Sequence, residues 1–298
     1  MSSPQKPLPI TNLQVFDDFI VLIINSPQNS LFKELMMNAQ PPSSTKPLLR
    51  PILTALAVII TLTTNTLAVV LPLNNRSTKE ISDSFQVFFT PAGYVFSIWS
   101  VIYTALIAFT IYSFLPRNRT NATLQAIFPW FMLSCAMNSA WIFLWHYGFY
   151  PLSLVVMLVL LASLVMVYIR LGIGETRYSG SDFWCVRFTF SIYLGWICVA
   201  TIANATALLY DVQWSGFGVS AEVWTAVMLG VAVTLGAILT ETRRDAVLVS
   251  VFLWAFVGIA VKHSAVAVVG TSAYLAVGLA AALVVRGFLL SRRRMQIA

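Results

Sequence analysis

Eight long stretches of this chain carry almost no charged side chain, and each is about as long as a membrane is thick. A helix needs about 20 apolar residues to cross a hydrocarbon core of about 30 Å. The chain of 298 residues is 58% hydrophobic and 10% charged, whereas about 25% charged is usual in soluble domains. We therefore expect an all-α integral membrane protein. The predicted spans are residues 52–73, 93–115, 127–147, 151–171, 188–209, 221–240, 246–261 and 265–285.

The positive charges predict how these spans are oriented. With eight spans, both termini lie on one side of the membrane, and that side holds 15 of the 18 Lys and Arg residues. The remaining three, Arg76, Lys79 and Lys262, lie opposite. Because basic loops stay inside, we expect a multi-pass plasma-membrane protein with both termini cytoplasmic. The net charge of +7 then reflects orientation and contact with the lipid bilayer, and we expect no nucleic-acid partner.

Residues 1–50 differ in composition from the rest of the chain. Pro, Ser, Gln and Asn are frequent there, and the apolar stretch from Phe16 to Ile24 is interrupted by two aspartates and is too short to span a membrane. We expect residues 1–50 to form a disordered cytoplasmic N-terminal tail. Met37 lies at a plausible second start, so the segment before it is interpreted as a candidate upstream extension.

Three of the predicted spans carry aromatic and amide side chains at helical spacing, so that each set shares one helix face. An asparagine in hydrocarbon seeks a hydrogen-bond partner, which favours faces turned toward a common interior rather than toward lipid. These residues are Trp99 and Tyr103 in the second span, Asn138, Trp141 and Trp145 in the third, and Tyr193, Trp196 and Asn204 in the fifth.

The predicted orientation places these residues at a common depth. Trp99 lies six residues into its span, or about 9 Å at a rise of about 1.5 Å per residue. Trp141 and Asn204 lie six and five residues before the outer ends of theirs. The sequence therefore predicts a ligand-binding pocket in the outer half of the membrane.

At these residues the sequence resembles the tryptophan-rich sensory protein family, also called the translocator protein or TspO/MBR family. The family's third-helix pattern appears as MNSAW at 137–141, and its fifth-helix pattern as YLGWICVATIAN at 193–204. The second-helix pattern appears as WSVIY at 99–103, preceded by TPAGYVF at 90–96. The matches follow the family's order and cover roughly residues 50–210.

The resemblance implies a TspO-like five-helix membrane bundle over residues 51–210. The family fold ends after five spans, so residues 211–286 are predicted to form a three-helix membrane extension, followed by a basic cytoplasmic tail at 287–298. The resemblance also implies a porphyrin or sterol-like ligand, held under the loop between the first two helices. Dimerisation is typical of the family, which makes a homodimer a further expectation.

Each predicted site residue also has a purely structural interpretation. Trp99, Trp141 and Trp196 offer large flat surfaces for stacking on an aromatic ligand, or they are helix-packing anchors. Asn138 and Asn204 donate to ligand carbonyls or carboxylates, or they tie the third and fifth helices together.

Four other aromatic residues lie near the ends of spans. The aromatic belt of the membrane interface explains side chains at that depth without any functional role. We interpret them as belt residues: Trp130, Trp145, Tyr147 and Tyr150.

The sequence shows no catalytic or metal-binding constellation. His146 and His263 lack a second His, Cys or carboxylate at metal-ligand spacing. The 11 carboxylates lie in tails, loops or span ends, which disfavours proton-coupled transport. We expect no enzyme and no required cofactor, with a tetrapyrrole as candidate ligand. The predicted function is a membrane sensor or carrier of a hydrophobic molecule; the alternative is a structural or chaperone-like membrane subunit.

Overall fold

The computed structural model describes residues 48–71, 73–176, 178 and 180–296, and these residues form helices and loops without a strand. The expected all-α membrane fold is confirmed. The long helices are α3 Leu49–Val70, α5 Ile98–Phe114, α7 Ala122–His146, α8 Tyr150–Arg170, α10 Thr189–Asp211, α11 Ala221–Arg243, α12 Ala246–Lys262 and α13 Ala267–Gln296. The short elements are η1 Leu73–Asn75, α4 Thr78–Ser84, η2 Gly93–Ser97, α6 Pro116–Arg119, α9 Gly180–Asp182, the π-helix η3 Phe183–Phe188 and η4 Gly216–Gly218.

Seven helical segments in the described part of the chain are long and apolar enough to cross a membrane. The remaining apolar helix, α12, has 17 residues and a length of about 25 Å. Ten of its residues are buried, so α12 is covered by other helices over most of its surface. The expected tail at 1–50 and the extension before Met37 lie almost wholly outside the described residues. At the other end, α13 continues through most of the expected basic tail, to Gln296.

Local sequence signals account for several helix ends. Asn121, Ser220 and Asp245 each accept a hydrogen bond from a backbone N–H in the first turn of α7, α11 and α12, which satisfies a donor that the helix leaves open. Pro151 lies in the first turn of α8, where a missing N–H costs nothing. The predicted second span begins with the 3-10 helix η2 before α5 starts at Ile98.

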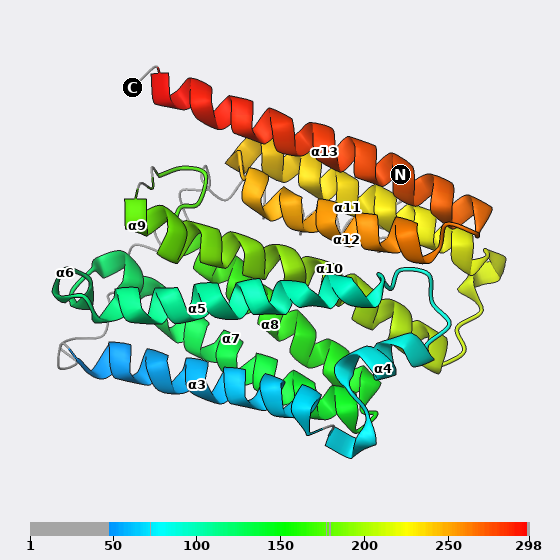
Figure 1. The fold of residues 1–298 in the computed structure, drawn as a ribbon, viewed down its shortest axis with the longest axis horizontal. Helices are drawn as coiled ribbons and strands as arrows, with labels where there is room; N and C mark the ends of the chain where they lie inside the picture. Colours follow the sequence, from blue (N-terminus) through cyan, green and yellow to red (C-terminus); the bar gives the residue numbers. More distant parts are fainter. Residues whose placement is uncertain (1–47, 72, 177, 179, 297–298) are drawn as a thin grey trace, which may run out of the picture. The chain divides into compact units, whose positions relative to one another are not determined.

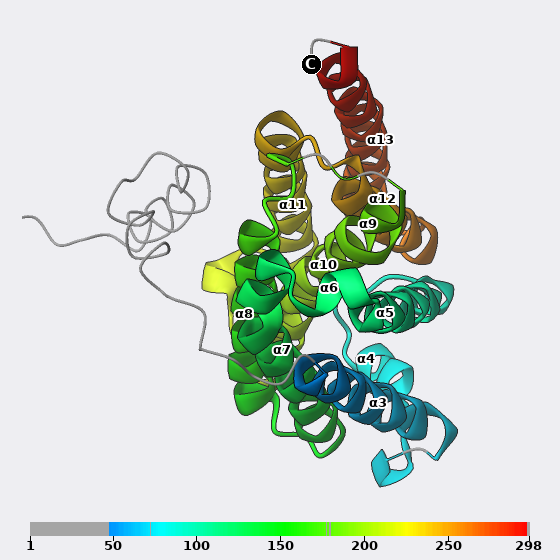
Figure 2. The ribbon, with the colours of Figure 1, turned by 90° about the vertical axis from the view of Figure 1, so that its left-hand side faces the viewer.

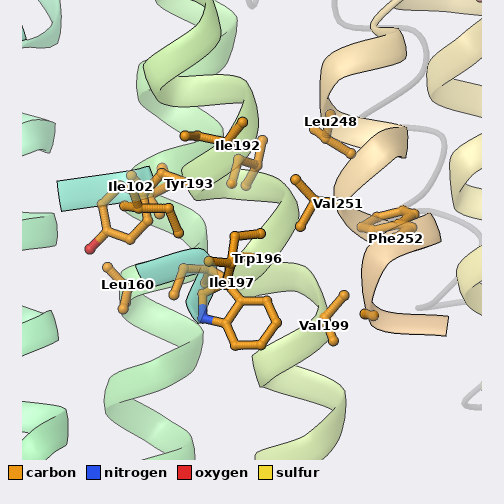
Figure 3. Packing of buried hydrophobic residues seen from close by; sticks show 14 of the residues in the cluster. Ile102, Leu160, Ile192, Tyr193, Trp196, Ile197, Val199, Leu248, Val251 and Phe252 are labelled. Carbon is orange, nitrogen blue, oxygen red and sulfur yellow. The ribbon is translucent and has the colours of Figure 1, made fainter. Parts of the chain in front are cut away.

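The long helices pack as neighbours in a defined order. α7 contacts α3 and α8, and α10 contacts α8 and α5. α12 lies against α10 on one side and against α13 and α11 on another (Figures 1 and 2). Figure 3 shows Leu248, Val251 and Phe252 of α12 beside α10, which carries Ile192 and Trp196. Among the described helices, α12 therefore forms the most extensive contact between the last three helices and the first five.

A buried carboxylate also joins the two groups of helices. Asp245, in the turn between α11 and α12, is fully buried and accepts hydrogen bonds from the Ser191 hydroxyl at 2.6 Å and the Tyr168 hydroxyl at 3.0 Å. Its other oxygen accepts from the backbone N–H of Leu248 at 3.2 Å. Buried polar groups are costly unless they are hydrogen-bonded, so this cluster fixes α12 against α8 and α10.

An aromatic pocket under a loop

The described helices enclose a pocket between α5, α7, α8 and α10, covered by the loop that joins α3 to η2. Its empty space is about 680 Å³ with the opening to solvent included, and about 50 Å³ of that admits the centre of a water-sized sphere. Side chains from four helices and the loop line it: Thr78, Ser82, Thr90, Pro91, Phe96, Trp99, Asn138, Trp141, Trp145, Met157, Leu160, Trp196, Ile197, Val199, Ala200, Ala203, Asn204 and Ala207.

The structure brings five of the seven predicted site residues to this pocket. The five are Trp99, Asn138, Trp141, Trp196 and Asn204. Tyr103 and Tyr193 do not line the pocket but contact Trp99, which does. The Tyr103 ring stacks on Trp99 with centroids 5.4 Å apart, and the Tyr193 ring meets Trp99 edge-on with centroids 6.3 Å apart. Both tyrosines therefore support the position of Trp99.

Two pairs of indoles form the aromatic walls. Trp141 and Trp145 of α7 are stacked, with centroids 5.6 Å apart and planes at 23°. Trp99 and Trp196 meet edge to face, with centroids 6.2 Å apart and planes at 83°. The assignment of Trp145 to the membrane-interface belt is wrong: its side chain is buried and lines the pocket. The sequence prediction that Trp145 shares a helix face with Trp141, from the spacing of four residues, agrees with this position.

A chain of hydrogen bonds passes behind the pocket and joins three helices. The Asn65 amide of α3 donates to the Asn138 carbonyl oxygen at 2.7 Å, and the Asn138 amide donates to the Tyr193 hydroxyl at 3.1 Å. Asn65 also donates to the backbone carbonyl of Thr61 at 2.8 Å. Asn138 thus ties α3, α7 and α10 together. Asn65 was not predicted, although an asparagine within an apolar span is the same signal that identified Asn138.

Asn204 has a different partner from the one expected. Its side chain meets the Ser153 hydroxyl of α8, with Nδ2 and Oγ 3.3 Å apart. This contact ties α10 to α8 rather than to α7. Both carboxamides therefore have structural partners and still line the pocket.

Three buried indole N–H groups at this pocket lack a hydrogen-bond partner among the described residues. They belong to Trp141, Trp145 and Trp196. A buried donor without a partner costs about 1–3 kcal/mol, and such groups are uncommon in folded proteins. Three of them around one pocket supply donors suited to an acceptor-bearing ligand.

We call the loop over the pocket, residues 74–92, the lid. Its helix α4 begins with a capping box in which Ser77 and Glu80 exchange side-chain and backbone hydrogen bonds. This exchange lowers the pKa of Glu80. The Asn74 amide donates to the backbone carbonyl of His146 at 3.0 Å, and the His146 ring lies 3.4 Å from the Thr78 hydroxyl. The first half of the lid is therefore held by the end of α7.

The second half of the lid is held by α12, which sequence reasoning did not connect with the site. The Trp254 indole donates to the carbonyl of Val95, next to the lid, at 3.0 Å. The Ala92 backbone N–H donates to the Gly258 carbonyl at 3.1 Å. The His263 Nε2 lies 3.1 Å from the Thr90 carbonyl oxygen; because a carbonyl only accepts, this nitrogen carries the proton.

Charged groups reinforce the contact between lid and α12. Asp83 of α4 pairs with Lys262 and with Lys79, each at 2.7 Å. Partial burial opposes ionisation of Asp83, but the hydrogen bonds from the two lysines prevail and lower its pKa. The pKa of His263 is lowered, chiefly by burial. The lid is thus fastened to α7 at one end and to α12 at the other.

The polar side chains at this pocket are hydrogen-bonding groups. In the described part of the chain, no group of three His, Cys, Asp or Glu residues lies close enough to hold a metal ion. Each of the two histidines contacts the lid. The pocket lining offers indole surface, three indole N–H groups, two carboxamides and the hydroxyl-bearing residues Thr78, Ser82 and Thr90.

The chain matches the family model described as TSPO-like protein over residues 51–286. The match begins in α3, includes α11 and α12, and ends within α13. No curated protein and no solved structure matches the chain. Because the family model covers well over half of the sequence, the chain belongs to the TSPO-like protein family.

Proposed function

We propose that this protein is a membrane sensor or carrier that binds a hydrophobic small molecule in the aromatic pocket. The observation that supports this most directly is the set of unpartnered indole N–H groups of Trp141, Trp145 and Trp196 around one pocket. A ligand with carbonyl or carboxylate oxygens would accept from such donors while its apolar part stacks on the indoles. The ligand class is flat, hydrophobic and acceptor-bearing, as in a tetrapyrrole or a sterol-like molecule.

Ligand entry on this proposal requires movement of the lid and indoles. The centre of a water molecule can lie within about 50 Å³ of the pocket, and a single water needs about 10–15 Å³ by the same measure. The closed pocket therefore has room for a few waters, and a ring system enters only when side chains rotate or the lid lifts. The contacts from α12 to Val95, Ala92 and Thr90 hold the closed state, so that α12 tunes access.

The proposal assigns no enzymatic step and no metal to this pocket. It places the lid on the outer side of a plasma membrane and both termini in the cytoplasm. The distribution of Arg residues in the described chain supports this orientation, since basic loops favour the cytoplasmic side. The end opposite the lid carries Arg50, Arg117, Arg119, Arg170, Arg187, Arg243, Arg244 and Arg286. We call it the arginine-rich end.

A structural or chaperone-like subunit is the second candidate function. The hydrogen bonds of Asn138 to α3 and α10, and that of Asn204 to α8, favour it because they assign the carboxamides to helix packing. On this alternative, pocket substitutions change stability and have no ligand to affect.

The test is a titration of the detergent-purified protein with protoporphyrin, followed by tryptophan fluorescence. Trp141→Phe and Trp196→Phe each remove one indole N–H and keep an aromatic ring. Losing one hydrogen bond of about 1 kcal/mol weakens the apparent affinity about fivefold. Trp184→Phe is the matched control, because Trp184 is 62% exposed and lies in η3 at the arginine-rich end.

Saturable quenching that is weaker in the two pocket variants and unchanged in the control supports the binding function. Quenching that does not saturate, and is equal in all four proteins, would move the assignment to a structural subunit. Circular dichroism on each variant shows that the helices are kept.

A further inference from the structure

A second crevice lies at the arginine-rich end, where α3 begins, α5 ends and α7 begins. Its empty space is about 380 Å³ with the mouth included. None of its lining residues lines the aromatic pocket. Polar groups that line it include Arg50 and Thr54 of α3, Ser113 of α5, Arg119 of α6 and Gln125 of α7.

The two arginines give this crevice an unbalanced positive charge. Among the described residues, the lining contains no Asp or Glu, and neither Arg50 nor Arg119 forms an ion pair there. By contrast, the neighbouring Arg117 is exposed and donates to the Ser181 hydroxyl at 2.9 Å, near Asp182. Two like charges beside one crevice repel each other, and an anion bound between them removes that cost.

The Arg119 guanidinium is held in a fixed position. Its Nε–H donates to the backbone carbonyl of Phe114 at 2.9 Å, where the chain leaves α5. A guanidinium has five N–H donors in a planar fork, so four remain for another acceptor. Such a fork matches the oxygens of a phosphate.

The inner part of the crevice is apolar. Phe109 and Phe131 line it, and both are buried. Their rings meet edge to face with centroids 5.2 Å apart, and each contacts the buried ring of Phe190. A molecule that occupies the whole crevice therefore has an anionic group at the arginines and an apolar part beside the phenylalanines.

We propose that this crevice is a binding site for a phospholipid with an anionic headgroup. The lipid phosphate lies at the mouth, between Arg50 and Arg119. The enclosed part of the crevice, about 30 Å³, has room for only a few waters, so one acyl chain reaches Phe109 and Phe131 only when side chains there move. Basic pockets between membrane helices are a recurrent way to hold such headgroups. The site is independent of the aromatic pocket, from which it differs in every lining residue.

The test measures lipid binding to the full-length protein in detergent micelles by native mass spectrometry. Phosphatidylglycerol is compared with phosphatidylcholine of the same chains, in wild type, Arg50→Gln and Arg119→Gln. We expect wild type to retain at least tenfold more phosphatidylglycerol than phosphatidylcholine, and each variant to lose most of that preference. Arg117→Gln is the matched control: it removes the same charge from α6 at a residue outside the crevice, and its preference is kept.

A parallel experiment adds glycerol phosphate as a competitor. It distinguishes a bound lipid from a bound free phosphate. Retention of phosphatidylglycerol in the presence of a large excess of glycerol phosphate supports the lipid. Displacement at comparable concentrations would overturn the lipid assignment. Equal retention of the two lipids by wild type, or an equal loss in Arg117→Gln, would overturn the site. Arg50→Gln keeps the test valid if Arg119→Gln does not fold, because Arg50 pairs with no described carboxylate.

Discussion

The first five long helices and the last three differ in what they bury. α5, α7 and α10 bring tryptophans and carboxamides to the aromatic pocket, whereas α12 buries mainly Leu, Val, Phe and Ala. Yet α12 fastens the lid over that pocket through Trp254, Gly258 and His263. The walls of the site thus belong to one group of helices, whereas its cover is held by both groups, by α7 at one end and by α12 at the other. A family model that spans both groups is consistent with this division.

Replacing Asp245 should have the largest effect, because it removes the buried joint between the two groups. Asp245→Ala leaves the Ser191 and Tyr168 hydroxyls and the Leu248 N–H without their acceptor. We expect the free energy of unfolding to fall by roughly 3–5 kcal/mol, because each buried donor left without an acceptor costs about 1–3 kcal/mol. Chemical denaturation in detergent measures it.

The control for this change is Asp211→Ala, which removes an exposed carboxylate at the end of α10. Its stability should stay within about 0.5 kcal/mol of wild type. If the two variants lose the same stability, the Asp245 cluster is not the joint that its geometry indicates.

A methyl group at position 258 should push the lid away from α12. The Cβ of Gly258→Ala would lie 2.2 Å from the Val95 side chain and 3.0 Å from that of Pro91, so the lid has to shift. We expect amide hydrogen exchange in residues 74–92 to rise at least tenfold.

Gly278→Ala is the matched control for the added methyl, because nothing lies within 4 Å of its Cβ. Its lid should exchange as in wild type, and α13 should gain about 0.5–1 kcal/mol from better helix propensity. Unchanged lid exchange in Gly258→Ala would show that α12 does not hold the lid.

Removing one hydrogen bond between α12 and the segment that follows the lid should have a smaller effect. Trp254→Phe keeps most of the ring and loses the donor to the Val95 carbonyl. A hydrogen bond is worth about 1 kcal/mol, so exchange of lid amides should rise about fivefold. A rise of the same size in Trp184→Phe, whose side chain lies in η3, would mean that the effect is not local.

Acidification should give the smallest effect. The pKa of His263 lies below its ordinary value of 6.5, chiefly because the ring is buried. As the pH falls below 6.5, the unfolded chain therefore takes up a proton at this site before the folded protein does, and stability decreases. We expect the melting temperature to fall between pH 7.5 and 5.5, and to fall less in His263→Gln. An equal fall in both proteins would assign the pH dependence to other groups.

The spans could be predicted from the sequence because hydropathy is a property of consecutive residues. The clustering of Trp99, Trp141 and Trp196 followed from helical spacing and depth, since a helix has a fixed rise and period. Asn65 was within reach of the same reasoning. Trp145 was placed on the face of Trp141, but its position near a helix end indicated the membrane interface, and its burial by Phe85 and Tyr150 became evident only from packing.

The sequence by itself determined the membrane class, the helices and the aromatic faces, because each depends on residues within a few turns of one another. Only the tertiary structure decided that α12 fastens the lid, that Asp245 joins α12 to α8 and α10, and that Arg50 and Arg119 share a crevice. These contacts join segments far apart in the chain, such as Trp254 and Val95 at a separation of 159 residues. The packing of helices against one another sets which distant side chains meet, and no local pattern of residues encodes that choice.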